Sequence, residues 1–347
     1  MKKLTALLLA LALALSMAAC GNSAAEVPTD TQPVTQAPTQ TEAPTETEAS
    51  ASREHFSIAA LKGPTAMGLV KLMDNAEKGG ETRNDYTFTL AGSADEVTPL
   101  LIKGELDMAC VPANLASVLY NKTGGQIVTL GINTLGVIYI VENGEEIQSL
   151  ADLKGKTIVA SGKGSTPEYG LRYLLSQNGI DPDKDLTIEW KSEHSECVSA
   201  MASGTATIAM LPQPFVTVAK GKIEGLRTAL DLTAEWDALD NGSGMITGVV
   251  VGNKAALEGK EAAVAAFLQD YAESVEWVNG NTDDAAALIG GYGIVDAAVA
   301  EKALPYCNIV CITGSEMESK LSGYLQALYD QDPKAVGGAL PGEDFYY

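Results

Sequence analysis

Histidine is nearly absent from this chain, which has only His55 and His194 among its 347 residues. Structural and catalytic zinc sites depend on clustered histidine and cysteine, and many nucleophilic enzymes pair a nucleophile with a histidine and a carboxylate. Neither histidine stands in such a cluster, and no such triad can be assembled from the two. We therefore expect no metal site, no cofactor and no catalytic residue.

Positive charge is also scarce, with 23 Lys and Arg residues against 45 Asp and Glu residues and a formal net charge of −22. Beyond Lys2 and Lys3 the chain has no basic run. Nucleic acids and anionic lipid surfaces are bound through clustered lysine and arginine. We expect neither as a partner.

Cysteine is too sparse for a disulfide framework. The chain has five cysteines, Cys20, Cys110, Cys197, Cys307 and Cys311. Small disulfide-stabilised domains have a much higher density of cysteine, and Cys110 stands in an apolar run typical of a buried strand. We expect the last four to be buried free thiols.

Long hydrophobic runs are absent except at the N-terminus. Lys2 and Lys3 precede the apolar residues 4–17, and two alanines then lead to Cys20. This is the pattern of a signal peptide over residues 1–19, and its apolar run is too short to span a bilayer comfortably. Cys20 after two alanines resembles a bacterial lipobox, which implies a lipid anchor on the outer face of the cell membrane. Free secretion is the alternative.

Residues 20–53 have almost no large apolar side chains and are rich in Thr, Pro and Glu. Such a segment cannot bury enough surface to offset the entropy cost of ordering. We expect a solvated tether between the lipidated Cys20 and a folded body. The remaining residues are sufficient for two lobes with cores of their own.

The body contains an internal repeat, in which three segments recur one hundred positions later. Residues 58–63, 86–90 and 104–112 correspond to residues 158–164, 186–190 and 204–212. Each copy has the pattern strand, Gly/Pro/Thr loop, helix, strand, loop, helix, strand. Strands that alternate with helices at this spacing predict an α/β fold with parallel sheets. Two similar lobes that face each other across a cleft are suited to holding a small ligand.

Two apolar runs, residues 137–141 and 247–251, follow the two copies and predict a pair of hinge strands. Four helices are expected between residues 261 and 329 without a sheet of their own, so they must pack on the first lobe. The predicted lobe I is therefore discontinuous, residues 54–135 plus 245–347, and lobe II covers residues 136–244. Opening and closing would occur about the two linkers.

Five segments of the body carry a resemblance to a known family: residues 61–65 (LKGPT), 104–109 (GELDMA), 149–158 (SLADLKGKTI), 164–167 (GSTP) and 210–215 (MLPQPF). With these segments the body resembles a type 2 periplasmic-binding fold, in which each lobe is a βαβ-wound sheet and two hinge strands join the lobes. More closely, it is similar to the substrate-binding lipoproteins of ABC importers in the nitrate/sulfonate/taurine (NitT/TauT) and thiamine-precursor group.

The resemblance implies an extracytoplasmic solute-binding receptor, a monomer, that delivers a small molecule to an ABC permease and its ATPase. A sensory lipoprotein that presents its ligand to a membrane receptor is an alternative. An enzyme on the same fold, such as a pyrimidine-precursor synthase, is a weaker alternative because the cysteine-rich motif of that enzyme is absent and the chain has an export signal.

Ligands of open parallel sheets bind beyond the carboxyl ends of the strands, where helices begin. The free N–H groups at such helix starts favour an anion or a carbonyl oxygen. Ser165 and Glu168 are expected to form a capping box, with Pro167 in the first turn. The ligand-binding residues predicted in this way are Lys62, Gly63, Pro64, Thr65, Asn114, Asn133 and Thr134 in lobe I, and Gly164, Ser165, Thr166, Pro167, Gln213, Pro214 and Phe215 in lobe II.

The chemistry of the ligand is narrowed but not identified by these residues. Lys62 and Lys163 can add positive charge if they turn inward. Many relatives in the group carry an acidic residue where this chain has Gln213, so its amide weakens the case for a cationic ligand. Phe215 can pack in the core or form a stacking wall for a heteroaromatic ring. An anion and a heteroaromatic molecule both remain open.

Overall fold

The structure, a computed structural model, describes residues 53–347. The predicted signal peptide, Cys20 and the predicted tether up to residue 52 lie outside this range. Arg53, the first described residue, donates hydrogen bonds to Thr82, Asn84 and Asp85. Within the described residues, no helix combines the length and the apolar character that crossing a bilayer requires.

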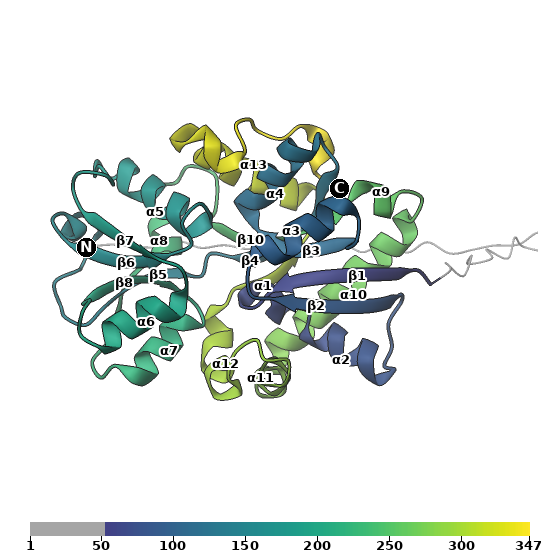
Figure 1. The fold of residues 1–347 in the computed structure, drawn as a ribbon, viewed down its shortest axis with the longest axis horizontal. Helices are drawn as coiled ribbons and strands as arrows, with labels where there is room; N and C mark the ends of the chain where they lie inside the picture. Colours follow the sequence, from purple (N-terminus) through teal and green to yellow (C-terminus); the bar gives the residue numbers. More distant parts are fainter. Residues whose placement is uncertain (1–52) are drawn as a thin grey trace, which may run out of the picture. The chain divides into compact units, whose positions relative to one another are not determined.

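Two β-sheets organise these residues (Figure 1). The sheet of lobe I has the order β11-β4-β10-β3-β1-β2, and that of lobe II the order β7-β6-β8-β5-β9. The strands of the first sheet are β1 (His55–Leu61), β2 (Asp85–Ala91), β3 (Met108–Pro112), β4 (Ile127–Leu135), β10 (Ile246–Asn253) and β11 (Ile309–Ile312). Those of the second are β5 (Ile138–Glu142), β6 (Thr157–Ser161), β7 (Thr187–Lys191), β8 (Ile208–Pro212) and β9 (Arg227–Asp231).

Helices cover both sheets, which confirms the α/β prediction (Figure 1). The α-helices are α1 (Pro64–Met67), α2 (Val70–Lys78), α3 (Ala94–Lys103), α4 (Ala113–Thr123), α5 (Thr166–Gln177), α6 (His194–Ala202), α7 (Phe215–Lys222), α8 (Leu232–Asp237), α9 (Lys254–Leu257), α10 (Glu261–Gly280), α11 (Thr282–Gly291), α12 (Ala297–Ala303) and α13 (Gly314–Gln331). Four 3₁₀ turns complete the set: η1 (Leu150–Leu153), η2 (Leu304–Tyr306), η3 (Pro333–Val336) and η4 (Glu343–Phe345).

The strand pairing confirms the internal repeat. Ile58 pairs with Phe88 in the first sheet, and Ile158 pairs with Ile188 in the second. The third strands follow the same rule, because Ala59 pairs with Ala109 and Val159 pairs with Ala209. The two lobes therefore repeat one arrangement of strands, with the same register.

The two predicted hinge strands, β5 and β10, lie in different sheets. β10 pairs antiparallel with β3 and β4, and β5 pairs antiparallel with β8 and β9. Each strand enters its sheet from the other lobe, at the carboxyl ends of the parallel strands, and so runs in the opposite direction. Both sheets are therefore mixed rather than wholly parallel.

The helix that begins at Pro64 is interrupted at Gly68 and Leu69, between α1 and α2. At Gly68 an added Cβ would lie 2.7 Å from the hydroxyl oxygen of Tyr271 on α10. The Gly68 carbonyl also accepts a hydrogen bond from the Ser274 hydroxyl at 2.6 Å. The close approach of α10 replaces the helical hydrogen bonding expected at this point.

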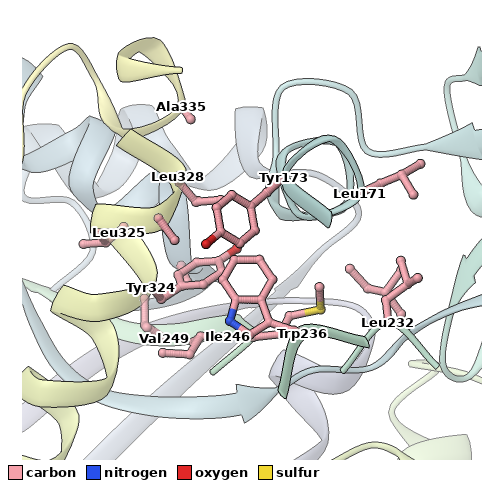
Figure 2. Close-up of a cluster of buried hydrophobic side chains, with 14 of the residues drawn as sticks. Leu171, Tyr173, Leu232, Trp236, Ile246, Val249, Tyr324, Leu325, Leu328 and Ala335 are labelled. Atoms are coloured by element: carbon pink, nitrogen blue, oxygen red, sulfur yellow. The ribbon is translucent and has the colours of Figure 1, made fainter. Parts of the chain in front are cut away.

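An aromatic cluster connects the two lobes (Figure 2). The Trp236 ring on α8 lies 4.6 Å from the Tyr173 ring on α5 and 5.4 Å from the Tyr324 ring on α13. Trp236 and Tyr324 are fully buried, and the Trp236 indole N–H donates to the Ser243 hydroxyl at 3.0 Å. The C-terminal helix α13 thus packs on lobe I, as the sequence predicted, and also on lobe II.

The four cysteines of the described residues are free thiols, as expected. Cys110, Cys197 and Cys307 are buried and Cys311 is half-buried. Burial raises the pKa of Cys110 and of Cys307 to about 12. Both thiols therefore stay protonated near neutral pH and are poor nucleophiles.

Removal of the Asp270 carboxylate is expected to destabilise lobe I strongly. This buried carboxylate accepts hydrogen bonds from the backbone and guanidinium of Arg83 and from the Tyr86 hydroxyl. Asp270→Ala leaves these donors without their acceptor, and we expect a loss of about 3 kcal/mol in the free energy of unfolding. Asp85→Ala, which breaks the exposed pair with Arg53, should cost less than about 1 kcal/mol. Urea unfolding of both variants measures the difference, and equal losses would contradict this account.

Candidate functional site

The N-terminal ends of α4 and α5 meet between the lobes. The Thr166 hydroxyl at the start of α5 lies 3.4 Å from the side-chain oxygen of Asn114 in the first turn of α4, and both side chains are buried. The Asn114 amide nitrogen donates to the carbonyl oxygen of Ala335 at 3.1 Å, which fixes the direction of its side-chain oxygen. Of the predicted ligand-binding residues, these two are joined across the lobes.

Three further predicted residues form a polar cluster within lobe I. The Asn133 amide donates to the carbonyl oxygen of Thr65 at 3.3 Å, and the Thr134 hydroxyl donates to the Asn133 oxygen at 3.0 Å. Gly248 on β10 allows this packing, because an added Cβ would lie 2.5 Å from both the Asn133 side-chain oxygen and the Thr65 methyl group. The cluster holds the loop after β1 against the ends of β4 and β10.

The helix start at residues 63–65 attracts an anion less strongly than the sequence predicted. α1 has four residues, so its dipole is small compared with that of a full helix. Gly63 has a φ of 143°, which favours glycine, and Lys62 is exposed. The Thr65 hydroxyl donates to the carbonyl oxygen of Leu61 at 2.9 Å and is therefore already engaged.

The loop before α5 is held by Glu168 in a way that differs from the prediction. The Glu168 carboxylate accepts from the Gly164 N–H at 2.7 Å and from the Arg172 guanidinium at 3.1 Å. The Ser165 hydroxyl donates to the Gly162 carbonyl oxygen at 2.8 Å. The expected capping box between Ser165 and Glu168 is therefore wrong, because Arg172 and the Gly164 N–H compete for the same carboxylate. Pro167 does occupy the first turn of α5, as expected.

Gln213, Pro214 and Phe215 follow β8 and lead into α7. The buried Gln213 side-chain oxygen accepts from the Thr217 hydroxyl at 2.9 Å. The half-buried Phe215 ring lies 4.9 Å from the His194 ring. These contacts stay within lobe II. The sequence left open whether Phe215 packs in the core or forms a stacking wall for the ligand. The structure answers this in part, because one side of the Phe215 ring packs on His194.

His194 belongs to this region and was not among the predicted ligand-binding residues. Its ring contacts the Ser161 hydroxyl through Nδ1, at the end of β6. Burial lowers its pKa to about 4, so the ring is neutral near pH 7. The sequence could have indicated His194 as a residue of the site, because His194 starts the helix that follows β7. The neighbouring Glu193 is exposed and forms a capping box with Glu196, as a rim position would.

The neutral state of His194 predicts a pH dependence of stability. Its folded-state pKa, about 4, lies below the ordinary value of 6.5, so the unfolded chain binds the proton more tightly. Stability attributable to His194 is therefore complete above pH about 6.5 and falls as the pH drops towards 4, by about 3 kcal/mol in total.

Nuclear magnetic resonance titration of the ring protons measures the pKa of His194 directly, with the exposed His55 in the same spectrum. We expect the His194 signals to stay unchanged between pH about 8 and 5.5. The variant His194→Gln should lose less stability than the wild type over the same pH range. A His194 titration midpoint near 6.5 would contradict the neutral assignment of this half-buried ring.

No ion-holding cluster of three or more His, Cys, Asp or Glu side chains occurs within residues 53–347. The predicted ligand-binding residues instead supply amides, hydroxyls, backbone N–H groups and the exposed Lys62. The two α/β lobes present these groups where the ends of their strands meet. This arrangement is typical of two-lobed solute-binding proteins.

The comparisons with known proteins identify the family. The chain belongs to the family described as "ABC transporter, phosphonate, periplasmic substrate-binding protein", whose model matches residues 79–288. A curated relative, the putative binding protein YtlA of Bacillus subtilis (strain 168), is 27% identical over 138 residues, which are 39% of this chain and 41% of the relative. The chain thus aligns with less than half the length of that relative.

Solved structures share the fold over most of the described residues. An ABC transporter protein from Parabacteroides distasonis is 24% identical, with a TM-score of 0.71 over 84% of this chain and 98% of that chain. The periplasmic aliphatic sulphonate binding protein SsuA from Escherichia coli is 19% identical, with a TM-score of 0.68 over 85% and 92%. The alkanesulfonate-binding protein SsuA from Xanthomonas axonopodis pv. citri, bound to MOPS, is 17% identical, with a TM-score of 0.63 over 83% and 94%.

Proposed function

We propose that this protein is the solute-binding receptor of an ABC importer and captures a small anion between its two lobes. The observation that carries the proposal is the family match over residues 79–288, which includes strands of both sheets. Lobe I, residues 54–135 plus 245–347, and lobe II, residues 136–244, are the two halves of the clamp. A ligand that contacts both halves binds the closed arrangement more tightly and shifts the population towards it.

The binding groups are the loops at the strand ends. In lobe II the first turn of α5, with Ser165 and Thr166, presents backbone N–H groups at the positive end of a twelve-residue helix. In lobe I, Asn114 and the loop of Lys62 and Gly63 face the same ligand. Asn133 and Thr134 hold that loop in place through Thr65. Phe215 adds an apolar wall, which also suits a heteroaromatic ring on the ligand.

Charged side chains, as well as the helix dipole of α5, support the proposal that the ligand is an anion. Lys62 and Lys163 are exposed, and within residues 53–347 neither has a carboxylate at ion-pair distance. Glu168 is the carboxylate next to the α5 loop, and Arg172 balances it at 3.1 Å. Gln213 contributes an amide where a carboxylate would attract a cation. Phosphonates and sulfonates, which the names of the family and of similar proteins mention, fit this set.

The location and the partners complete the proposal. Cys20 carries the lipid, residues 21–52 form the tether, and the binding body, which includes Arg53, works outside the membrane as a monomer. The bound solute passes to a permease with a cytoplasmic ATPase. The protein performs no catalysis, so a bound compound is released chemically unchanged.

Native mass spectrometry of the full chain tests the proposal. The protein is purified without denaturation, and a second sample is stripped of ligand and mixed with methylphosphonate, ethanesulfonate, nitrate or a thiamine precursor. We expect one added mass that is lost on unfolding, and a higher midpoint of thermal unfolding when the same compound is returned. No adduct and no stabilisation with any of these compounds would overturn the anion assignment, and chemical conversion of a bound compound would overturn the receptor.

A further inference from the structure

A second cavity lies away from the α5 loop, between α7 of lobe II and α12 with η2 of lobe I. Its volume is about 820 Å³, which is within the range of small-molecule sites. α7 and α12 pack against each other there, at the lower side of Figure 1. The lining includes Tyr139 on β5 and Asp231 on β9 from lobe II, and Lys302 and Tyr306 from lobe I. We call it the α7–α12 cavity.

Three lysines line the α7–α12 cavity, Lys220 and Lys222 from α7 and Lys302 from α12. Within residues 53–347, none of them has a carboxylate at ion-pair distance. The carboxyl end of α7 favours the first two lysines through the helix dipole, but it does not account for Lys302 on the other lobe. All three lysines are exposed, and they come from helices of two different lobes.

The remaining polar lining includes two donors that are not engaged by any other described residue. Burial, followed by the nearby Asp231, raises the pKa of Tyr139 to about 12, so its hydroxyl keeps its proton. No hydrogen bond from the Tyr139 hydroxyl or the Gln213 amide nitrogen is formed within the described part of the chain. Asp231 is the one carboxylate among the lining residues, and it already accepts from the Thr233 N–H at 2.9 Å.

The walls of the cavity are apolar and aromatic. Val218, Ala298 and Val299 face it, and Tyr306 lies at its edge with 57% of its surface exposed. An exposed tyrosine beside unpaired lysines offers a flat face to a ring, while the ammonium groups attract negative charge. A ligand that satisfies both features carries several negative charges on a flat apolar body.

We propose that the α7–α12 cavity is a second binding site, for a small organic anion with two or more negative charges and a flat apolar body. The site shares only Gln213 with the residues proposed to hold the transported solute. A ligand in it contacts α7 and α12 together, so its binding favours the arrangement in which these two helices touch. The site therefore links an anion other than the transported solute to the opening of the lobes.

Benzene-1,3,5-tricarboxylate is the probe, and benzoate is its monoanionic control. The full chain is treated with acetic anhydride with and without each probe, and mass spectrometry measures the acetylation rate of each lysine. We expect the tricarboxylate to slow acetylation of Lys220 and Lys302 by about threefold or more at saturation, because a bound carboxylate covers and stabilises the ammonium form. Lys122 and Lys334, which are unpaired lysines elsewhere, should react at unchanged rates.

Calorimetry on two matched variants completes the test. Lys220→Gln with Lys302→Gln should weaken tricarboxylate binding about tenfold, while Lys122→Gln with Lys334→Gln, which makes the same change of net charge, should alter it less than about twofold. Benzoate should bind at least about tenfold more weakly than the tricarboxylate. Absence of tricarboxylate binding, binding without protection of Lys220 and Lys302, or equal effects of the two double variants would overturn the proposal.

Discussion

Thr166→Arg is expected to weaken binding of the transported anion by about a hundredfold, or about 2.7 kcal/mol. Thr166 is fully buried where the starts of α4 and α5 meet, and its hydroxyl lies 3.4 Å from the Asn114 oxygen. An arginine side chain does not fit between these helix ends, so the lobes can no longer approach. The loss should therefore appear in affinity, since the closed arrangement binds the ligand through both lobes.

The control for this prediction is Gln177→Arg, which adds the same charge at the exposed far end of α5. We expect this variant to bind the anion within about twofold of the wild type, since an exposed substitution has little effect. Calorimetry with whichever of methylphosphonate, ethanesulfonate or nitrate gives an adduct measures both affinities, and circular dichroism verifies that both variants fold. Unchanged affinity in a folded Thr166→Arg protein would remove α5 from the site.

Trp236→Ala is expected to lower the free energy of unfolding by about 4 kcal/mol. The indole is fully buried between Tyr173 and Tyr324, and its N–H group bonds to Ser243 (Figure 2). Removal of the ring leaves a cavity at the point where α5, α8 and α13 meet, and neither lobe can close it alone. Because the cluster joins the lobes, we also expect the variant to unfold in two steps where the wild type unfolds in one.

Trp190→Ala is the matched substitution on the half-buried edge strand β7. We expect it to cost about 2 kcal/mol, because less of the ring leaves water on folding, and to preserve a single transition. Denaturant unfolding followed by circular dichroism compares the two variants. A Trp236→Ala protein that loses no more stability than Trp190→Ala would show that the cluster does not hold the lobes together.

The repeat could be predicted from the sequence because local patterns determine it. Ile58 and Ile158 stand in apolar runs bounded by glycine-rich loops, and the strand register follows directly from that spacing. Ser93 and Glu96, and Glu193 and Glu196, form the two capping boxes at equivalent positions. These features depend on residues close together in the chain.

The errors arose where distant residues compete with local preference. Glu168 has the spacing of a capping box, but the Gly164 N–H and Arg172 hold its carboxylate instead. Gly68 stands inside a helical pattern, and the packing of Tyr271 from α10 interrupts the helix there. Neither contact has a signature in a single sequence.

Part of the candidate site was missed for the same reason. The position of His194 after β7 marks it as a residue at the strand ends, but its burial against Phe215 and Ser161 depends on the packed structure. The α7–α12 cavity depends on the contact between two helices from different lobes, and no motif in either helix predicts it.

Hydrogen–deuterium exchange of the full chain, with and without the anion identified by mass spectrometry, tests the central claim that the solute is held between the lobes. We predict slower exchange in three segments, residues 62–66 and 112–116 in lobe I and residues 162–168 in lobe II, when the anion is bound. Protection confined to one lobe, or protection only around α7 and α12, would contradict capture between the lobes at the strand ends.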